Sequence, residues 1–246
     1  MSGAQDSGFD ARQRADAYPP GIGQHYWLLS RNRIVHAALR HAGAAAPVLD
    51  LGCGPGATVH YLRAHGIDCA GTDLSTYEPV VPELASVIQF GADPLTLPAD
   101  ERSRFRTLLL LDVLEHLAAP VELLRQVVGA YPNVAHLVLT VPARQELWSN
   151  YDEYYGHQRR YDRAALRALC RDAGLRVRDC RYVFHSLYVA LALQRLLLRG
   201  DRALEFAPVR YRRLHQLIAG CLYADAQLVP GAWLGTSVLA VAETGR

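Results

Sequence analysis

The sequence predicts one α/β domain built on a seven-stranded, mostly parallel sheet with helices on both faces. Short apolar runs alternate with helical patterns between residues 48 and 184. The first apolar run ends in closely spaced glycines, and a last apolar run follows a long helical stretch near the C-terminus. Parallel neighbours need long crossover connections, so this alternation favours a parallel sheet that is covered on both sides.

The elements follow in a clear order. Residues 1–23 are small and polar and predict a flexible N-terminal segment, and residues 24–41 predict an N-terminal helix. Strands are expected at 48–51, 67–72, 86–90, 106–111, 134–141, 175–184 and 238–241, and further helices at 57–65, 120–130 and 162–173. Asp162 suits the start of the last of these helices and Gly174 its end. We therefore expect a single domain over 24–246, with a helical cap insertion at 185–228 before the last strand.

Composition narrows the class of protein. The 246 residues are 50% hydrophobic and 20% charged, which is enough apolar material for a full core. The net charge is +2, from 26 basic and 24 acidic residues, and every basic residue is arginine. Because nucleic-acid binding depends on positive charge, we expect no nucleic-acid partner.

Cysteine usage and hydropathy indicate a cytoplasmic protein. The five cysteines are widely spaced without a CxxC pair, so neither a disulfide framework nor a zinc site is expected. Residues 1–20 lack the apolar core of a signal peptide. The apolar stretch 182–198 is shorter than the about 20 residues of a membrane span. An arginine excess over 157–213 leaves two interpretations open: a solvated cap, or peripheral contact with the inner face of a membrane.

The most informative segment is 48–56, VLDLGCGPG. Glycines after a strand allow the backbone to turn tightly and to approach a ligand without a Cβ collision. Gly52, Gly54 and Gly56 follow a G-x-G-x-G spacing, which differs from the dinucleotide pattern G-x-G-x-x-G. Asp50 precedes them, and a carboxylate there would repel a pyrophosphate but attract an ammonium group.

Two further acids follow the next strands. Asp73, seventeen residues after Gly56, ends the second strand, where an acid can accept both hydroxyls of a ribose. Asp93 follows the third strand and could accept a hydrogen bond from an adenine amino group, or could only form a turn. Ribose, adenine and an ammonium-bearing tail describe S-adenosylmethionine (SAM) better than NAD.

With these motifs the chain resembles the class I SAM-dependent methyltransferases, over about residues 47–141. Residues 108–117, LLLLDVLEHL, resemble the fourth-strand motif of the ubiquinone-type subgroup. The resemblance implies a Rossmann-like fold and SAM as cofactor. It implies that the cofactor is bound by Asp50, Gly52, Cys53, Gly54, Gly56, Asp73, Leu74, Asp93, Asp112 and Tyr26. Tyr26, together with Tyr18 and Trp27, either belongs to the core beside the N-terminal helix or forms a lid near the sulfonium cation.

A second block resembles a bacterial branch of this class that is linked to cell-envelope or polysaccharide chemistry. It consists of residues 141–142, 147–149, 152, 156–157, 159–161 and 235–237, together with 26–27 and 31–33. The cap insertion matches that branch only loosely, so the resemblance leaves the acceptor open.

The expected acceptor side lies beyond the fourth and fifth strands. His116 follows the fourth strand, where it either lines the active site or begins a solvated helix. His157 is the favoured general base with Asp152 orienting it, because histidine titrates nearest neutrality; the alternative is a surface loop with local charge pairs. We expect acceptor contacts from Tyr155, Arg159, Arg160 and Tyr161, where the arginines would grip an anionic group, and no metal site.

The predicted activity is therefore methyl transfer from SAM to an oxygen or nitrogen atom of a small molecule, a sugar or a lipid-linked saccharide, by a monomer or homodimer. Three alternatives remain open. The chain could be a catalytically silent, cofactor-binding partner subunit. It could be a nicotinamide dehydrogenase, although the glycine spacing disfavours this. It could also be an aminopropyl transferase, which would require a more acidic acceptor pocket.

Overall fold

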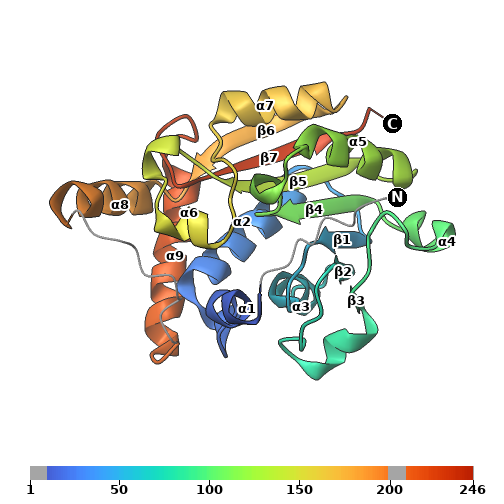
Figure 1. Cartoon of the computed structure of the whole chain (residues 1–246), viewed down its shortest axis with the longest axis horizontal. Helices are drawn as coiled ribbons and strands as arrows, with labels where there is room; N and C mark the ends of the chain where they lie inside the picture. Colours follow the sequence, from blue (N-terminus) through green and yellow to red (C-terminus); the bar gives the residue numbers. More distant parts are fainter. Residues whose placement is uncertain (1–9, 199–208, 246) are drawn as a thin grey trace.

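The computed structural model describes residues 10–198 and 209–245, and it confirms the predicted α/β fold with a seven-stranded sheet. The strand order is β3-β2-β1-β4-β5-β7-β6 (Figure 1). The strands are β1 (Val48–Leu51), β2 (Cys69–Asp73), β3 (Ile88–Phe90), β4 (Thr107–Leu111), β5 (His136–Pro142), β6 (Arg176–Val183) and β7 (Ser237–Glu243). β7 runs antiparallel to both of its neighbours, and the other pairings are parallel.

Strand β4 shows why the apolar runs become central strands. All five of its residues are buried, because helices cover both faces of the sheet. Leu108 and Leu110 belong to the core on one face, and Leu109 and Leu111 to the core on the other. The alternation follows from the two-residue period of a strand.

Two helical layers complete the sandwich. α5 (Pro120–Ala130) and α7 (Arg163–Asp172) supply the core of one face. α2 (Tyr26–His41), α3 (Ala57–Ala64) and α9 (Arg212–Leu228) supply the core of the other. The helix predicted from Asp162 is capped as expected, since the Asp162 carboxylate accepts the N–H of Ala165 at 2.7 Å.

The N-terminal part of the chain contains a helix that the sequence pattern did not indicate. α1 (Ala11–Ala17) begins at Asp10, which forms a reciprocal capping box with Gln13. It contacts α6 (Asn150–Tyr154), since Gln13 donates to the carbonyl of Tyr154, and the Tyr154 hydroxyl donates to Asp16 at 2.6 Å. Residues 1–9 lie outside the described part of the chain. For them, the expectation of a flexible segment rests on the sequence alone.

The predicted cap insertion corresponds to two helices. α8 (His185–Leu198) follows β6, and α9 precedes β7 and packs along α2 (Figure 1). Residues 199–208, between the two helices, are not described. Within residues 10–198 and 209–245, none of the helices combines the length and the apolar character needed to cross a membrane.

Short elements fill the connections. They are η1 (Ile22–Gln24), η2 (Pro82–Ser86), α4 (Ala99–Arg102), η3 (Leu114–His116) and η4 (Gln145–Leu147). Backbone strain is concentrated where strands end. Asp112, Arg144 and Phe184 have φ values of 59°, 70° and 63°, and each lies just beyond the carboxyl end of a strand. Non-glycine residues at positive φ cost free energy and collect at functional sites, which directs attention to this edge of the sheet.

Candidate active site

The glycine loop connects β1 to α3 and requires residues without side chains. Gly52, Gly54 and Gly56 have φ values of 74°, 54° and 85°, a region that other residues rarely adopt. A Cβ on Gly54 would lie 2.7 Å from the ring of Tyr18, and one on Gly56 would lie 2.2 Å from Ile88 Cδ1. The loop therefore offers bare backbone at the end of β1.

Asp73 braces this loop from the end of the neighbouring strand. Its Oδ2 accepts the Gly54 N–H and its Oδ1 accepts the Ser75 N–H, both at 2.8 Å. Burial raises the pKa of Asp73, and these two hydrogen bonds work against that rise. Each carboxylate oxygen keeps a second lone pair that can accept a ligand hydroxyl.

Asp50 is the most unusual carboxylate at this edge. It is 2% exposed, and its Oδ1 has no hydrogen-bond partner within the described part of the chain. Burial raises the pKa of Asp50 to about 7, with Arg31 opposing the rise and the charges of Asp73 and Asp112 adding to it. A buried carboxylate without a partner is costly, so the site fits a ligand that brings an ammonium group.

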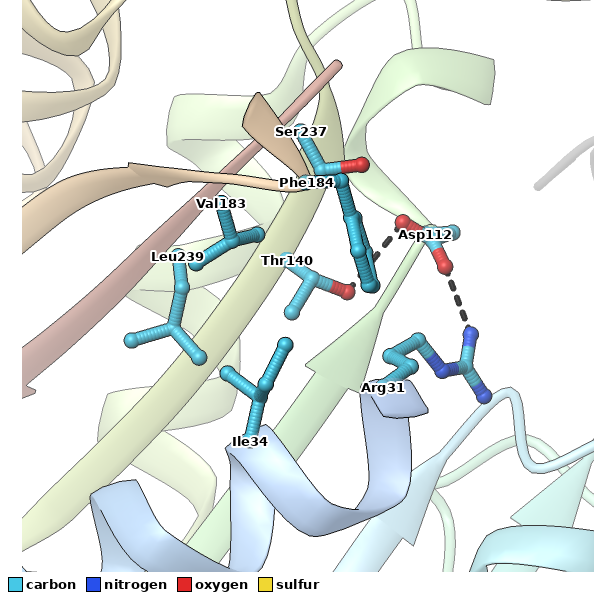
Figure 2. A pocket seen from close by; sticks show the side chains of 8 residues that line it. All are labelled: Arg31, Ile34, Asp112, Thr140, Val183, Phe184, Ser237 and Leu239. Carbon is cyan, nitrogen blue, oxygen red and sulfur yellow. Dashed lines mark hydrogen bonds and ion pairs between the residues drawn. The ribbon is translucent and has the colours of Figure 1, made fainter. Parts of the chain in front are cut away.

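Arg31 was missed as a site residue by sequence reasoning, although it connects two elements of the site. Its guanidinium reaches from α2 to Asp112 at 2.5 Å, and it also donates to Thr58 at 3.1 Å. Asp112 in turn accepts the Thr140 hydroxyl at 3.1 Å, so Arg31, Asp112 and Thr140 together border a small pocket beside Phe184 (Figure 2). Its sequence signals were its place in the segment 31–33, which resembles the bacterial branch, and its position one helical turn after Trp27, over whose ring it lies at 5.0 Å.

Three other predicted cofactor residues have different surroundings. Asp93 is exposed, and its Oδ1 accepts the Leu95 N–H at 2.9 Å, which is the turn-forming arrangement. Leu74, next to Asp73, is 47% exposed. Cys53 is buried under the loop, and its thiol packs against Gly71, where an added Cβ would lie 2.6 Å from the sulfur.

Two tyrosines near the N-terminus lie at different places. Tyr18 lies against Gly54 and packs edge-on against Tyr77, with 5.5 Å between the ring centroids. Burial raises the pKa of Tyr18, and the charges of Tyr77 and Asp73 add to the rise. Tyr26 stacks on His215 of α9 at 5.7 Å. Tyr18, which was not among the predicted cofactor residues, is thus the tyrosine in contact with the glycine loop.

The predicted contact between His157 and Asp152 is present in the segment that follows β5. Nδ1 of His157 lies 2.8 Å from Oδ1 of Asp152. Arg160 binds the same carboxylate through two hydrogen bonds of 2.8 and 2.9 Å, and it also donates to the carbonyl of Ala143. Burial alone would raise the pKa of Asp152, but the hydrogen bonds from His157 and Arg160 outweigh it and lower the pKa to about 2. The guanidinium of Arg160 therefore binds groups of the protein itself, namely the Asp152 carboxylate and the Ala143 carbonyl.

His116 and Glu115 lie against this pair. The rings of His116 and His157 meet edge to face, with centroids 4.8 Å apart. Burial lowers the pKa of His116 to about 4, with His157 adding to the effect. Glu115 is buried instead of lying on a solvated helix, and burial together with the charge of Asp112 raises its pKa.

The remaining predicted acceptor residues support the loop to different extents. Tyr155 is buried and packs against Tyr151 at 4.6 Å. The buried Tyr161 donates its hydroxyl hydrogen to the carbonyl of Leu114 at 3.2 Å. Arg159 is partly exposed and donates to the carbonyl of Ala118 at 3.3 Å. Of the two predicted arginines, Arg159 is the one on the surface.

Comparisons with known proteins agree with this geometry. The model of a family described as "Methyltransferase domain" matches residues 24–179. A search of curated protein sequences found no significant match.

Solved structures resemble the fold at low sequence identity. The plantazolicin methyltransferase BpumL in complex with SAH is 15% identical, with a TM-score of 0.52 over 96% of this chain and 89% of that chain. A candidate sarcosine dimethylglycine methyltransferase from Galdieria sulphuraria is 14% identical, with a TM-score of 0.52 over 88% and 86% of the two chains. The methyltransferase domain of bacterial CtHen1 is 15% identical, with a TM-score of 0.52 over 87% and 97%. At this identity the likeness shows a common fold.

Proposed function

The chain belongs to the methyltransferase domain family and uses SAM as its methyl donor, and we propose that it methylates an oxygen or nitrogen atom of a small-molecule or saccharide acceptor. The family match covers the glycine loop, Asp50, Asp73 and the His157–Asp152 pair. The acceptor class and the role of each residue are the proposal.

One observation carries the donor half of the proposal: the buried Oδ1 of Asp50 has no hydrogen-bond partner among the described residues, and it lies next to the glycine loop that Asp73 braces. Asp50 would hold the ammonium group of the donor, and Asp73 its ribose hydroxyls. The backbone of Gly52, Gly54 and Gly56 would allow close approach, and Leu74 offers an apolar surface for the adenine. Bound there, SAM supplies a methyl group that is already activated for displacement.

Further cofactor contacts are proposed for the remaining residues. Asp112 contributes to the negative charge around Asp50. Cys53 packs beneath the loop. In Asp93, Oδ1 accepts the turn-forming hydrogen bond from the Leu95 N–H, and Oδ2 would accept a hydrogen bond from the adenine amino group. Tyr26 contributes through the packing of α2, whereas Tyr18 provides the direct aromatic contact with the loop.

On the acceptor side, His157 is the proposed proton acceptor. Asp152 fixes its Nδ1, so Nε2 is the ring nitrogen that can take a proton from an acceptor hydroxyl or amine. Arg160 acts as a positioning residue because it holds Asp152, and His116 packs against the His157 ring. Tyr155 and Tyr161 shape this loop, and Arg159 is placed to contact an anionic group on the acceptor. Aligning the reactants in a water-poor site supplies much of the rate in such a displacement.

We infer the bacterial ubiquinone-type-like branch from residues 108–117 and from the block around His157. From this resemblance we include sugars and lipid-linked saccharides among the proposed acceptors. Incubation of the pure protein with methyl-labelled SAM and a panel of sugars, lipid-linked saccharides, phenols and amines tests the proposal. We expect label transfer to one hydroxyl or amine class; SAM binding without transfer to any acceptor would instead indicate a silent partner subunit.

A further inference from the structure

Three potential metal ligands from two separate parts of the chain meet on the proposed acceptor side of the site. Glu115 and His116 belong to η3, which follows β4, and His157 lies in the loop after α6. One carboxylate oxygen of Glu115 and one ring nitrogen of each histidine lie within 4.8 Å of one another. The fold thus brings two imidazoles and one carboxylate together, although His116 and His157 are 41 positions apart in the sequence.

Hydrogen bonds to other groups of the protein fix the rings of the two histidines. Asp152 engages Nδ1 of His157 at 2.8 Å and is itself fixed by Arg160 and by the Ser149 N–H at 2.9 Å. The His116 ring is held by hydrogen bonds to the backbone of Tyr155 and Gly156. A carboxylate or backbone carbonyl behind the imidazole is the usual outer support of a histidine that binds a metal, because it fixes the tautomer and the ring orientation.

Glu115 supplies an independent reason to expect a cation. Its side chain is 1% exposed, and its Oε2 has no hydrogen-bond partner within residues 10–198 and 209–245. Leaving a buried carboxylate oxygen without a donor is costly, and a cation bound beside it would remove that cost. The nearest guanidinium groups that act on Glu115, Arg31 and Arg160, are already paired with Asp112 and Asp152.

We propose that Glu115, His116 and His157 bind one divalent metal ion, and that this ion is zinc or manganese. Two imidazoles and one carboxylate are a donor set for such ions, whereas magnesium and calcium prefer oxygen ligands alone. With bonds of about 2.1 Å, donors around a tetrahedral ion lie about 3.4 Å apart, so binding draws the three groups together. Three protein ligands leave at least one position open for the acceptor.

The chemical consequence of this site rests on the proposed methyl transfer. An acceptor hydroxyl bound to the ion loses its proton more readily, and the proton passes to water. The oxygen then forms a bond to the methyl carbon as the carbon–sulfur bond breaks, and that electron pair stays on sulfur. With the ion bound, Nε2 of His157 is a ligand instead of a proton acceptor, and the site favours hydroxyl over amine acceptors.

Calorimetric titration tests the site without donor or acceptor. The protein is stripped with a chelator and titrated with ZnCl₂, MnCl₂ and MgCl₂, in a Cys221→Ser background because that exposed thiol is a rival zinc ligand. We expect one zinc or manganese per chain and much weaker magnesium binding. Glu115→Gln and His157→Ala should each lower the affinity at least about tenfold. His41→Ala, which removes an exposed histidine of α2, should leave it unchanged.

Two results would overturn the site: no zinc or manganese binding to the stripped protein, or binding that Glu115→Gln and His157→Ala leave intact. Circular dichroism of each variant confirms that it is folded, and Glu115→Gln keeps the shape of the side chain. Separate SAM titrations distinguish the two proposals. A protein that binds SAM but neither ion refutes only the metal site, and one that binds an ion at these residues but not SAM refutes only the proposed function.

Discussion

The guanidinium of Arg31 lies 2.5 Å from the carboxylate of Asp112, an ion pair that joins α2 to the end of β4. The two residues are 81 positions apart in the sequence. Asp112 has positive φ, and the pair is mostly shielded from water, with side chains 14% and 22% exposed. The contact holds the N-terminal helix against the strand end and places positive charge near Asp50.

Arg31→Gln should destabilise the protein, because it leaves Asp112 shielded without its cation. We expect the free energy of unfolding to fall by about 1–3 kcal/mol. Arg63→Gln is the matched control, since Arg63 pairs with Asp68 on the surface at 3.3 Å and such pairs contribute about 0–1 kcal/mol. Urea denaturation measures both variants, and equal losses would contradict a structural role for the Arg31–Asp112 pair.

Asp50 should release a proton when SAM binds. Its pKa is raised to about 7 by burial, so below that pH the free protein carries the proton. A cationic ligand favours the carboxylate and lowers this pKa, so affinity should rise with pH up to about 7, by at most about tenfold per unit. The charged groups that act on Asp50 are Arg31, which opposes the rise in its pKa, and Asp73 and Asp112, which add to the rise.

Calorimetry at pH 6 in two buffers of different ionisation enthalpy measures that proton. The wild-type protein should show a buffer-dependent enthalpy, and Asp50→Asn should bind more weakly without it. Proton release that persists in Asp50→Asn would assign the proton to another group.

Gly54→Ala should cost more stability than an alanine at another glycine of similar φ. Gly43 has φ of 62° and open space around it, so Gly43→Ala should cost only the backbone strain of about 1 kcal/mol. At Gly54 the new methyl group also meets Tyr18, and we expect a total of about 2–4 kcal/mol.

A double-mutant cycle isolates the contact with Tyr18. In a Tyr18→Ala background the cost of Gly54→Ala, measured by urea denaturation, should fall to that of Gly43→Ala. An unchanged cost would mean that Tyr18 does not lie on the loop in solution.

His157→Ala should slow methyl transfer and leave SAM affinity intact, because His157 lies on the acceptor side. We expect a loss of about 10²–10⁴-fold in turnover, because His157 either takes the acceptor proton itself or helps to hold the ion that promotes its release. The labelled-methyl assay with the acceptor identified from the panel measures turnover, and calorimetry measures affinity. Weakened SAM binding with unchanged turnover would show that the donor and acceptor sides have been exchanged.

The sequence predicted the elements that local patterns encode. Seven apolar runs became the seven strands, and Asp162 caps its helix as expected. The antiparallel direction of β7 was not specified, because a run such as 238–241 has the same pattern in either direction. α1 was missed because its residues are mostly polar or small and it depends on contacts with the distant Tyr154.

The positions of candidate site residues were predictable where a motif marks them. Asp50, Asp73 and the glycines lie together at one strand edge, and His157 pairs with Asp152. Arg31 lies in the resembling segment 31–33 but had no assigned role, and Tyr18 belongs to no motif. Only folding brings these two residues to Asp112 and Gly54. Arg160 was expected to bind an anion of the acceptor, but its internal pairing with Asp152 depends on side-chain geometry that spacing does not encode.

Calorimetric titration of SAM into the wild-type protein and Asp73→Ala tests the central claim most directly, namely that the glycine loop and its flanking aspartates hold the methyl donor. Asp68→Ala, an exposed acid preceding the same strand, is the control. We predict one SAM per wild-type chain, unchanged binding by Asp68→Ala, and about 10–100-fold weaker binding by Asp73→Ala, which loses charged hydrogen bonds of about 1.5–3 kcal/mol. Equal SAM affinity of the wild-type protein and Asp73→Ala, or no SAM binding by the wild-type protein, would contradict the account.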